Sequence, residues 1–237
     1  MTKNAIITGA GTGVGRHTAI LLSQAGWNLT LTGRTEKTLQ ETMSLTGANA
    51  SNCQLVIGSV ADESFVAELT QKAEAKFGLT EVLVNSAGTN TPKRTLDVLS
   101  MADYHDLINT NLHGCYYAIQ AVLPAMRKAK SGTIVNIVSD ASLWGMPLAG
   151  AAYTISKFGL RGLTQAINAE ENKNGIRAIG ILPGEINTPI LKLRPSEPTA
   201  EHKATMLLPE DVAACAKLAI ELPSRAVVQE LLVRPCR

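Results

Sequence analysis

The sequence lacks the patterns by which proteins commonly bind structural metals. Its four cysteines include no pair spaced as CxxC, and its four histidines are dispersed along the 237 residues. Neither arrangement matches the ligand spacing of a zinc site. We therefore expect no metal site. We also expect reduced thiols, as is usual in a cytoplasmic protein.

The sequence also has little net charge and few aromatic residues. Lysine and arginine number 22 and aspartate and glutamate 20, which leaves a formal charge of +2. A nearly neutral chain has no electrostatic footprint for phosphates, so we expect no nucleic-acid partner. Aromatic residues make up 4% of a chain that is 45% apolar. The core must therefore consist mainly of alanine, valine, isoleucine and leucine.

Long hydrophobic runs are missing as well. No apolar run reaches the roughly 18–20 residues that cross a bilayer. The stretch Ala5–Ile7 before the first glycines is too short for the apolar part of a signal peptide. We expect a soluble, cytoplasmic protein that has no membrane partner.

Short β-branched runs alternate with longer amphipathic stretches along the chain. Most of the short runs are apolar on both faces, as in strands that are buried on both sides. The predicted strands are Ala5–Ile7, Leu29–Thr32, Gln54–Ile57, Val82–Val84, Ile134–Val138, Ala178–Leu182 and Val227–Val233. The predicted helices are Val14–Ala25, Glu36–Leu45, Glu63–Phe77, about Met101–Lys128, Ala151–Asn172 and Pro209–Glu221. This alternation predicts an α/β fold of three layers, with a doubly wound parallel sheet of about seven strands between helices.

No linker, repeat or low-complexity tract divides the chain, so residues 1–237 are expected to form a single domain. The segment Thr188–Leu208 is irregular and rich in proline and charge. It is longer than an ordinary loop, and we interpret it as a lid over a substrate site.

A glycine-rich turn follows the first predicted strand and leads at once into a helix. It reads Thr8-Gly9-Ala10-Gly11-Thr12-Gly13-Val14-Gly15. Glycines let the backbone turn sharply and approach a pyrophosphate, and the helix N-terminus then offers free N–H groups to the phosphates. The turn therefore predicts a dinucleotide-binding site of the Rossmann type.

The end of the second predicted strand bears on the choice of dinucleotide. NAD-specific sites place a carboxylate there to bond the ribose 2′-hydroxyl, whereas this chain has Gly33 followed by Arg34. A guanidinium can bind a 2′-phosphate through two hydrogen bonds. We therefore expect NADP in preference to NAD. The alternative is a solvent-exposed arginine at a helix start.

Tyr153 and Lys157 lie four residues apart in a predicted helix, and such side chains share one face, about 5–6 Å apart at Cβ. Free tyrosine is protonated at neutral pH, and an ammonium group beside it favours the phenolate. A tyrosine of this kind can give a proton to a carbonyl oxygen or take one from an alcohol.

Further motifs fall in order along the chain. Asn85-Ser86-Ala87-Gly88 follows the fourth strand, Asn111 lies within the long helix, and Ser139 ends the fifth strand. Pro183-Gly184-Glu185-Ile186-Asn187-Thr188 follows the sixth strand. With the glycine turn and the Tyr–Lys pair, this series resembles the short-chain dehydrogenase/reductase family, with its TGxxxGxG, NNAG, YxxxK and PGxVxT motifs. The resemblance covers nearly the whole chain.

The resemblance implies a role for each matching residue. Tyr153 would act as general acid/base, and Lys157 would favour its phenolate and hold the ribose hydroxyls of the nicotinamide. Ser139 would hydrogen-bond the substrate oxygen as charge develops there. Asn111 would hold a water that relays protons to Lys157. The implied cofactor contacts are Gly9, Thr12, Gly13, Val14, Gly15, Arg34, Ser59, Val60, Asn85, Ala87, Gly88, Tyr153, Lys157, Pro183, Gly184, Ile186 and Thr188.

Four features depart from the family's pattern. The largest is the C-terminus, which lacks the glycine-rich segment that many members carry after the last strand. Ser59 stands where an aspartate usually reaches the adenine amino group, although the backbone of Val60 can still make a contact. Ser86 replaces the second asparagine of NNAG. The spacing from Ser139 to Tyr153 is one residue longer than usual, so Ser142 remains an alternative for the catalytic serine.

The resemblance implies an NADP-dependent oxidoreductase that transfers a hydride between nicotinamide and a carbonyl or secondary alcohol. One alternative is a reductase of 3-oxoacyl thioesters on a carrier protein, for which Arg127, Lys128 and Lys130 offer a small basic patch. Another is a dehydrogenase of 3-hydroxy acids or serine, because such family members end in a similar way. A third is a non-catalytic NADP-binding protein. The resemblance also implies a homotetramer or homodimer packed through Ala151–Asn172 and Pro209–Glu221.

Four residues beside the motifs have two interpretations each. Asp140 and Glu185 could bind a cationic group of a substrate, or they could be solvated loop carboxylates. Trp144 and Met146 could line an apolar pocket, or they could pack in the ordinary way.

Overall fold

The computed structural model describes residues 3–47 and 52–236, and within them seven strands form one parallel sheet. The strands are β1 (Asn4–Thr8), β2 (Asn28–Gly33), β3 (Cys53–Ile57), β4 (Val82–Asn85), β5 (Gly132–Ile137), β6 (Ile176–Pro183) and β7 (Glu230–Val233). Their order across the sheet is β3-β2-β1-β4-β5-β6-β7. The predicted doubly wound parallel sheet is confirmed. Residues 1, 2, 48–51 and 237 of the predicted domain lie outside the described residues.

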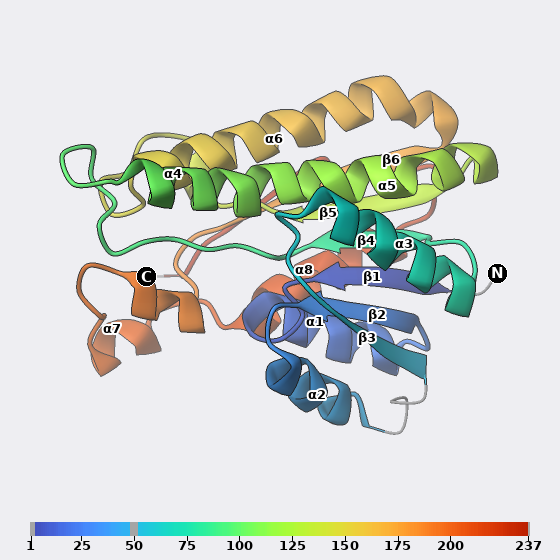
Figure 1. The fold of residues 1–237 in the computed structure, drawn as a ribbon, viewed down its shortest axis with the longest axis horizontal. Helices are drawn as coiled ribbons and strands as arrows, with labels where there is room; N and C mark the ends of the chain where they lie inside the picture. The colour runs from blue at the N-terminus through green and yellow to red at the C-terminus, as the bar shows by residue number, and fades with distance from the viewer. Residues whose placement is uncertain (1–2, 48–51, 237) are drawn as a thin grey trace.

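Helices cover both faces of the sheet (Figure 1). The α-helices are α1 (Gly13–Gln24), α2 (Glu36–Leu45), α3 (Glu63–Phe77), α4 (Met101–Ile108), α5 (Gly114–Ala129), α6 (Ala151–Glu171), α7 (Ala200–Ala204) and α8 (Pro209–Glu221). Helices α1, α2 and α8 lie on one face, and α3, α5 and α6 lie on the other. The strand order reverses between β1 and β4, which is where folds of this kind bind ligands, at the carboxyl ends of the strands.

The central strand β1 shows why the sequence forms this fold. Ala5 and Ile7 belong to the core beneath α1 and α8, where Leu22 also lies. Ile6 points to the opposite face and belongs to the core beneath α3 and α5, with Ile119. Because successive side chains of a strand point to opposite faces, a continuous apolar run buries both of them. Both cores are mainly aliphatic, as the low aromatic content predicts.

The long helix predicted over Met101–Lys128 is interrupted. Helix α4 passes through a π-helical turn, η2 (Asn109–His113), before α5 begins. Within this turn the buried amide of Asn111 exchanges hydrogen bonds with the backbone of Thr89. A tertiary contact therefore anchors the turn. The hydrophobic periodicity of the helix sequence does not reveal such a contact, so the turn was not predicted. Such turns are frequent at functional sites.

The last strand is shorter than predicted. The sequence predicts a strand over Val227–Val233, but β7 begins only at Glu230. The preceding segment bends around the guanidinium of Arg177, which donates hydrogen bonds to the carbonyls of Pro223 and Ala226. That side chain holds the segment as a turn, so the strand starts later.

The predicted irregular segment Thr188–Leu208 contains two short helices. These are η5 (Pro189–Leu193), a 3-10 helix, and α7. A parallel β-bridge pairs Ile186 with Leu207 and closes the segment at its base. The segment is thus an ordered excursion beside the carboxyl end of β6.

A buried carboxylate joins the ends of α5 and α6. Glu171 accepts hydrogen bonds from Arg127 Nη2 at 2.6 Å and Nε at 3.0 Å, and from Asn174 Nδ2 at 2.9 Å. The bonds from Arg127 and then from Asn174 lower the pKa of Glu171 to about 2. The carboxylate therefore stabilises the fold while it is ionised.

We expect Glu171→Gln to lower the free energy of unfolding by about 1–2 kcal/mol at neutral pH. The lowered pKa sets an upper bound of about 3.4 kcal/mol, and solvent screens the half-exposed guanidinium of Arg127. Since the folded-state pKa is the lower one, the contribution is complete above about pH 5 and is lost as the pH falls from about 4.5 to 2. Urea unfolding at neutral and acidic pH measures it, with the exposed neighbour variant Glu170→Gln as control. Equal acid sensitivity of wild type and Glu171→Gln would contradict it.

Candidate active site

A cavity of about 290 Å³ opens at the carboxyl ends of the central strands. Its walls come from the glycine turn after β1, the loop after β4, the ends of β5 and β6, the start of α6, and the segment after β6. It lies where the strand order reverses, so the topology places it at the expected ligand position.

The glycine turn forms one end of this cavity. Gly9 has φ +63°, and a Cβ there would stand 2.7 Å from Ala87 Cα in the loop after β4. A Cβ on Gly15 would stand 2.4 Å from the carbonyl oxygen of Gly9. Both contacts are too close for any side chain, so glycine is required if β1, α1 and the β4 loop are to meet this tightly.

The N-terminus of α1 faces the same cavity. Thr12, the residue before the helix, is extended and makes no side-chain hydrogen bond to the first turn. Thr12, Gly13 and Val14 all line the cavity. The first N–H groups of a helix lack partners within the helix, and they carry the positive end of its dipole. The arrangement fits an anionic group such as a pyrophosphate.

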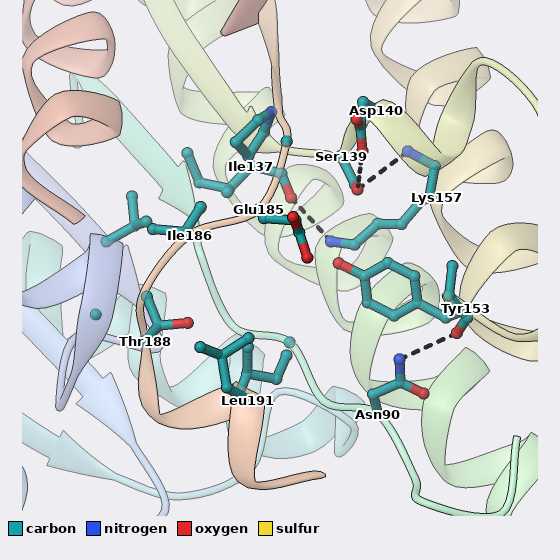
Figure 2. Close-up of a pocket in the computed structure, with 18 of the residues that line it drawn as sticks. Asn90, Ile137, Ser139, Asp140, Tyr153, Lys157, Glu185, Ile186, Thr188 and Leu191 are labelled. Atoms are coloured by element: carbon teal, nitrogen blue, oxygen red, sulfur yellow. Dashed lines mark hydrogen bonds between the residues drawn. The ribbon is translucent and has the colours of Figure 1, made fainter. Parts of the chain in front are cut away.

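Tyr153 and Lys157 enter the cavity from α6. Figure 2 shows the tyrosine hydroxyl and the lysine ammonium pointing into the same space. Lys157 Nζ lies 5.5 Å from the centroid of the Tyr153 ring and donates a hydrogen bond of 2.9 Å to the carbonyl of Ile137 at the end of β5. Lys157 is buried, and the Ile137 carbonyl fixes its ammonium beside the tyrosine.

Ser139 lies two residues beyond the end of β5. Its hydroxyl lines the cavity and accepts a hydrogen bond from the backbone N–H of Ala141 at 3.1 Å. Ser142, the alternative, is fully buried, and its hydroxyl donates to the carbonyl of Ser139 at 2.7 Å. The geometry therefore favours Ser139 for contact with a ligand, because the Ser142 hydroxyl is buried and bonds to the backbone of Ser139 instead of facing the cavity.

Asn111 stands behind the cavity rather than in its wall. Its amide oxygen accepts from Thr89 N at 2.8 Å, and its amide nitrogen donates to Thr89 O at 3.0 Å and to Ser156 Oγ at 3.3 Å. Ser156 Oγ in turn donates to the carbonyl of Tyr153 at 2.7 Å. The side chain thus braces the β4 loop against the helix that carries Tyr153. The implied water relay stays a prediction.

The segment after β6 forms the far wall. The motif residues Pro183, Gly184, Ile186 and Thr188 all line the cavity. Thr188 also approaches the glycine turn, since its Cγ2 would stand 3.3 Å from a Cβ on Gly13. The two predicted cofactor-binding segments therefore close around one space.

Two of the four motif residues after β4 reach the cavity wall. Ser86 and Gly88 line the cavity, and the backbone N–H groups of Ser86 and Ala87 are bound by Thr8 Oγ1. Asn85 instead faces the core, where its amide donates to Asn136 Oδ1 at 2.9 Å. Its side chain braces β4 against β5.

Three other predicted cofactor residues lie outside this cavity, at the edge formed by β2 and β3. Gly15 in α1 and Ala87 in the β4 loop do not line it either. Arg34 is exposed at the end of β2. The hydroxyl of Ser59 accepts from the backbone of Ala61 at 3.3 Å, and Val60 is buried. The two strand ends are adjacent, because Gly58 N donates to Gly33 O at 3.1 Å.

The sequence model of the short chain dehydrogenase family matches residues 3–198 of this chain. The chain belongs to the short-chain dehydrogenase family. This confirms the predicted family and, with it, the predicted class of oxidoreductase.

Relatives of this short-chain dehydrogenase extend over its whole length. An uncharacterised oxidoreductase of Staphylococcus saprophyticus is 34% identical, over 98% of this chain and 97% of the relative. An alcohol dehydrogenase of the archaeon Thermococcus sibiricus, solved with 5-hydroxy-NADP, has a TM-score of 0.87 at 28% identity, over 98% and 96% of the two chains. The closed form of a serine dehydrogenase complexed with NADP+ has a TM-score of 0.88 at 26% identity, over 98% and 94%.

None of the arginines Arg16, Arg94 and Arg194 of this short-chain dehydrogenase was predicted as a site residue. Arg16 in α1 donates to the carbonyl of Gly11 at 2.5 Å and to that of Thr38 at 3.2 Å. It thereby ties the glycine turn to α2, which begins two residues after Arg34. Arg94 in the β4 loop is buried and lines the cavity, which Arg194 also lines. No motif marks any of the three in the sequence.

Both acidic residues beside the motifs are paired. Asp140 Oδ2 lies 3.1 Å from Arg234 Nη2, and that guanidinium stacks 4.7 Å from the centroid of the Trp144 ring. Glu185 accepts from Arg194 and from His202, both at 3.0 Å. Neither acid is the solvated carboxylate of the second interpretation. Met146 lines the cavity, whereas Trp144 does not and is half-exposed beneath Arg234.

Residues 3–47 and 52–236 contain no group of three or more histidine, cysteine, aspartate or glutamate side chains placed to hold a metal ion. Within the same residues, no helix combines the length and the apolar character needed to traverse a bilayer. The cytoplasmic location stays a prediction.

Proposed function

We propose that this chain is an NADP-dependent carbonyl reductase or alcohol dehydrogenase. The observation that carries the proposal is the convergence of Tyr153, Lys157 and Ser139 on one cavity whose other end is the glycine turn and the α1 N-terminus. A proton donor and a site for an anionic dinucleotide thus share one space. In this proposal residues 1–237 act as a single catalytic domain, and Thr188–Leu208 is its substrate lid.

The residues present fit a bound NADP. The glycine turn and the first turn of α1 would hold the pyrophosphate. Pro183, Gly184, Ile186 and Thr188 would hold the nicotinamide end, and Arg34 would bind the 2′-phosphate. The NADP-type ligands named for the Thermococcus sibiricus alcohol dehydrogenase and for the serine dehydrogenase support this choice.

A bound NADP would supply or accept the hydride, and the side chains of this chain would donate or accept the proton. In reduction, Tyr153 donates its hydroxyl proton to the carbonyl oxygen as the new C–H bond forms, so the carbonyl becomes an alcohol. Lys157, fixed by the Ile137 carbonyl, stabilises the phenolate that remains. Ser139 hydrogen-bonds the substrate oxygen as negative charge develops there. Oxidation of an alcohol runs through the same groups in reverse.

The test is NADPH consumption with a panel of aldehydes, ketones, 3-oxoacids and 3-oxoacyl thioesters. We expect turnover of at least one small-molecule class. Tight NADPH binding without turnover of any of them would instead support a non-catalytic NADP-binding protein.

The reductase of carrier-protein thioesters and the dehydrogenase of 3-hydroxy acids or serine differ in their support. A carrier protein would dock on the basic patch, but Arg127 is already paired with Glu171, and Lys130 donates to Asn174 Oδ1 at 2.8 Å. This leaves little of the basic patch available, so thioesters on a carrier protein rank below free substrates. Oxidation of 3-hydroxy acids or serine gains support from the similar serine dehydrogenase.

We expect Arg34→Ala to weaken NADPH binding by about 10- to 100-fold, because charge-assisted hydrogen bonds to the 2′-phosphate are lost. NADH binding should change little, since NADH has no such phosphate. Arg34→Lys keeps the charge without the two-pronged geometry of the guanidinium. Its affinity for NADPH should therefore lie between those of wild type and Arg34→Ala. Fluorescence titration with both cofactors measures this. Wild-type protein that binds NADH at least as tightly as NADPH would refute the assignment.

We also propose a homotetramer or homodimer packed through α6 and α8. Ile155 and Phe158 are about half-exposed on α6, and Leu218 is exposed on α8. Sedimentation at micromolar concentration should show a dimer or tetramer, and Phe158→Glu should shift it toward smaller species. A monomeric wild-type protein would contradict the proposal.

A further inference from the structure

Two guanidinium groups line the cavity that Tyr153 enters. Arg94 comes from the loop after β4, and Arg194 from the end of η5 in the segment Thr188–Leu208. Both side chains are largely buried, with Arg94 at 5% and the Arg194 side chain at 14% exposure. Burying a charge is costly unless a partner compensates it. The partners of the two arginines therefore matter.

Arg94 has only neutral partners. It donates to the carbonyl of Thr91 at 2.8 Å, to that of Leu148 at 2.8 Å, and to that of Leu193. Among residues 3–47 and 52–236 no carboxylate lies within ion-pair distance of it. Burial, and then the nearby guanidinium of Arg194, lower the pKa of Arg94, while the phenol of Tyr153 raises it. Arg94 thus lies within electrostatic reach of both groups.

Arg194 has one carboxylate partner, and it shares that partner. Glu185 accepts from Arg194 Nη2 at 3.0 Å through one oxygen and from His202 Nε2 at 3.0 Å through the other. Figure 2 shows the Glu185 carboxylate directed into the cavity on the side of Tyr153. On this side of the cavity, two positively charged guanidinium groups, of Arg94 and Arg194, are compensated by one carboxylate, that of Glu185. The excess positive charge favours the binding of a second anionic group there.

We propose that the substrate carries a carboxylate, which replaces Glu185 as the partner of Arg194 while the substrate carbonyl faces Tyr153. The planar fork of a guanidinium matches a carboxylate through two hydrogen bonds. Glu185 keeps its bond with His202 during the exchange, and Arg94 adds a fixed positive charge behind the site. This inference rests on the proposed function and names its substrate class as short oxoacids and hydroxy acids. Asp140 keeps its ion pair with Arg234 and offers no free carboxylate to a cationic substrate group.

The test compares each acid with its neutral methyl ester, using pyruvate with methyl pyruvate and acetoacetate with methyl acetoacetate. In wild type we expect kcat/KM for the better acid to exceed that for its ester by about 10-fold or more. Arg194→Met should reduce this acid-to-ester ratio by about 10- to 100-fold, and Arg194→Lys should reduce it less. Glu185→Gln should raise the ratio, because the competing carboxylate is gone.

Lys203 provides a matched control. It carries a positive charge in the same segment, but it pairs with Glu197 at 2.5 Å and does not line the cavity. Lys203→Gln should therefore leave the acid-to-ester ratio as in wild type. Opposite shifts in Arg194→Met and Glu185→Gln, with no shift in Lys203→Gln, are not expected from general loosening of the segment.

A binding measurement separates this inference from the proposed function. The probe is 3-hydroxy-3-methylbutyrate, a tertiary alcohol that cannot be oxidised to a ketone, with its methyl ester as the neutral control. Calorimetric titration of the NADP-loaded protein should show tighter binding of the acid, and Arg194→Met should abolish that preference. Equal binding of acid and ester, or equal kcat/KM for both, would overturn the carboxylate site alone. Absence of turnover with every substrate would instead overturn the proposed function.

Discussion

Replacing Tyr153 with phenylalanine is expected to reduce kcat/KM for carbonyl reduction by about 1,000-fold or more. The substitution removes the proton donor and leaves the ring, so the packing of α6 around Lys157 is kept. The glycine turn and the α1 N-terminus lie at the other end of the cavity. NADPH binding should therefore change by no more than about 3-fold, well below the cost of losing a charge-assisted hydrogen bond.

Tyr104→Phe is the matched control, because it removes a tyrosine hydroxyl that does not line the cavity. Steady-state kinetics and NADPH fluorescence titration should be run on both variants. Retained carbonyl reduction in Tyr153→Phe would refute its role as general acid. Loss of NADPH binding together with activity would show instead that the hydroxyl supports the cofactor site.

The fold could be predicted because its signals are local. Strand β1 is apolar at Ala5, Ile6 and Ile7, and a short run of this kind is stable only when helices cover both of its faces. The glycine turn was recognisable for the same reason. Backbone atoms approach Gly9 and Gly15 at distances that exclude a Cβ. The close packing therefore requires glycine at these positions, and the glycines are visible in the sequence. Ser139, Tyr153 and Lys157 were found through their order along the chain.

The charged walls of the cavity could not be predicted, because they depend on contacts between distant segments. Arg94 donates to Leu148 and Leu193, which lie 54 and 99 residues further along the chain. Asp140 pairs with Arg234, 94 residues away. Periodicity and motif spacing report on neighbours in sequence, so the partners of the acidic residues stayed open until the fold was known. The amide of Asn111 is a related case. A motif locates the residue in the sequence, but it does not reveal that the side chain bonds to Thr89 and Ser156.

The largest expected loss of stability comes from Arg177, a buried arginine of β6 that has no role in the proposed chemistry. Its guanidinium closes the end of α8 and the turn before β7. It donates to Thr133 Oγ1 at 3.1 Å and to the carbonyls of Pro223 at 2.8 Å, Ala226 at 2.6 Å, Ile220 at 2.9 Å and Leu222 at 2.8 Å. One side chain thus satisfies four backbone carbonyls that no single neutral side chain could serve.

We expect Arg177→Met to lower the free energy of unfolding by about 3–5 kcal/mol, because each orphaned buried carbonyl costs about 1–3 kcal/mol and water can reach some of them. Arg177→Lys should recover only part of this, since an ammonium has three donors where the guanidinium has five. The control is Arg161→Met, which removes the partly exposed ion pair with Glu230 and should cost about 1 kcal/mol or less. Urea unfolding of the three variants measures the differences. Were Arg177→Met as stable as Arg161→Met, the carbonyls would have other donors, and Arg177 would not be what delays the start of β7.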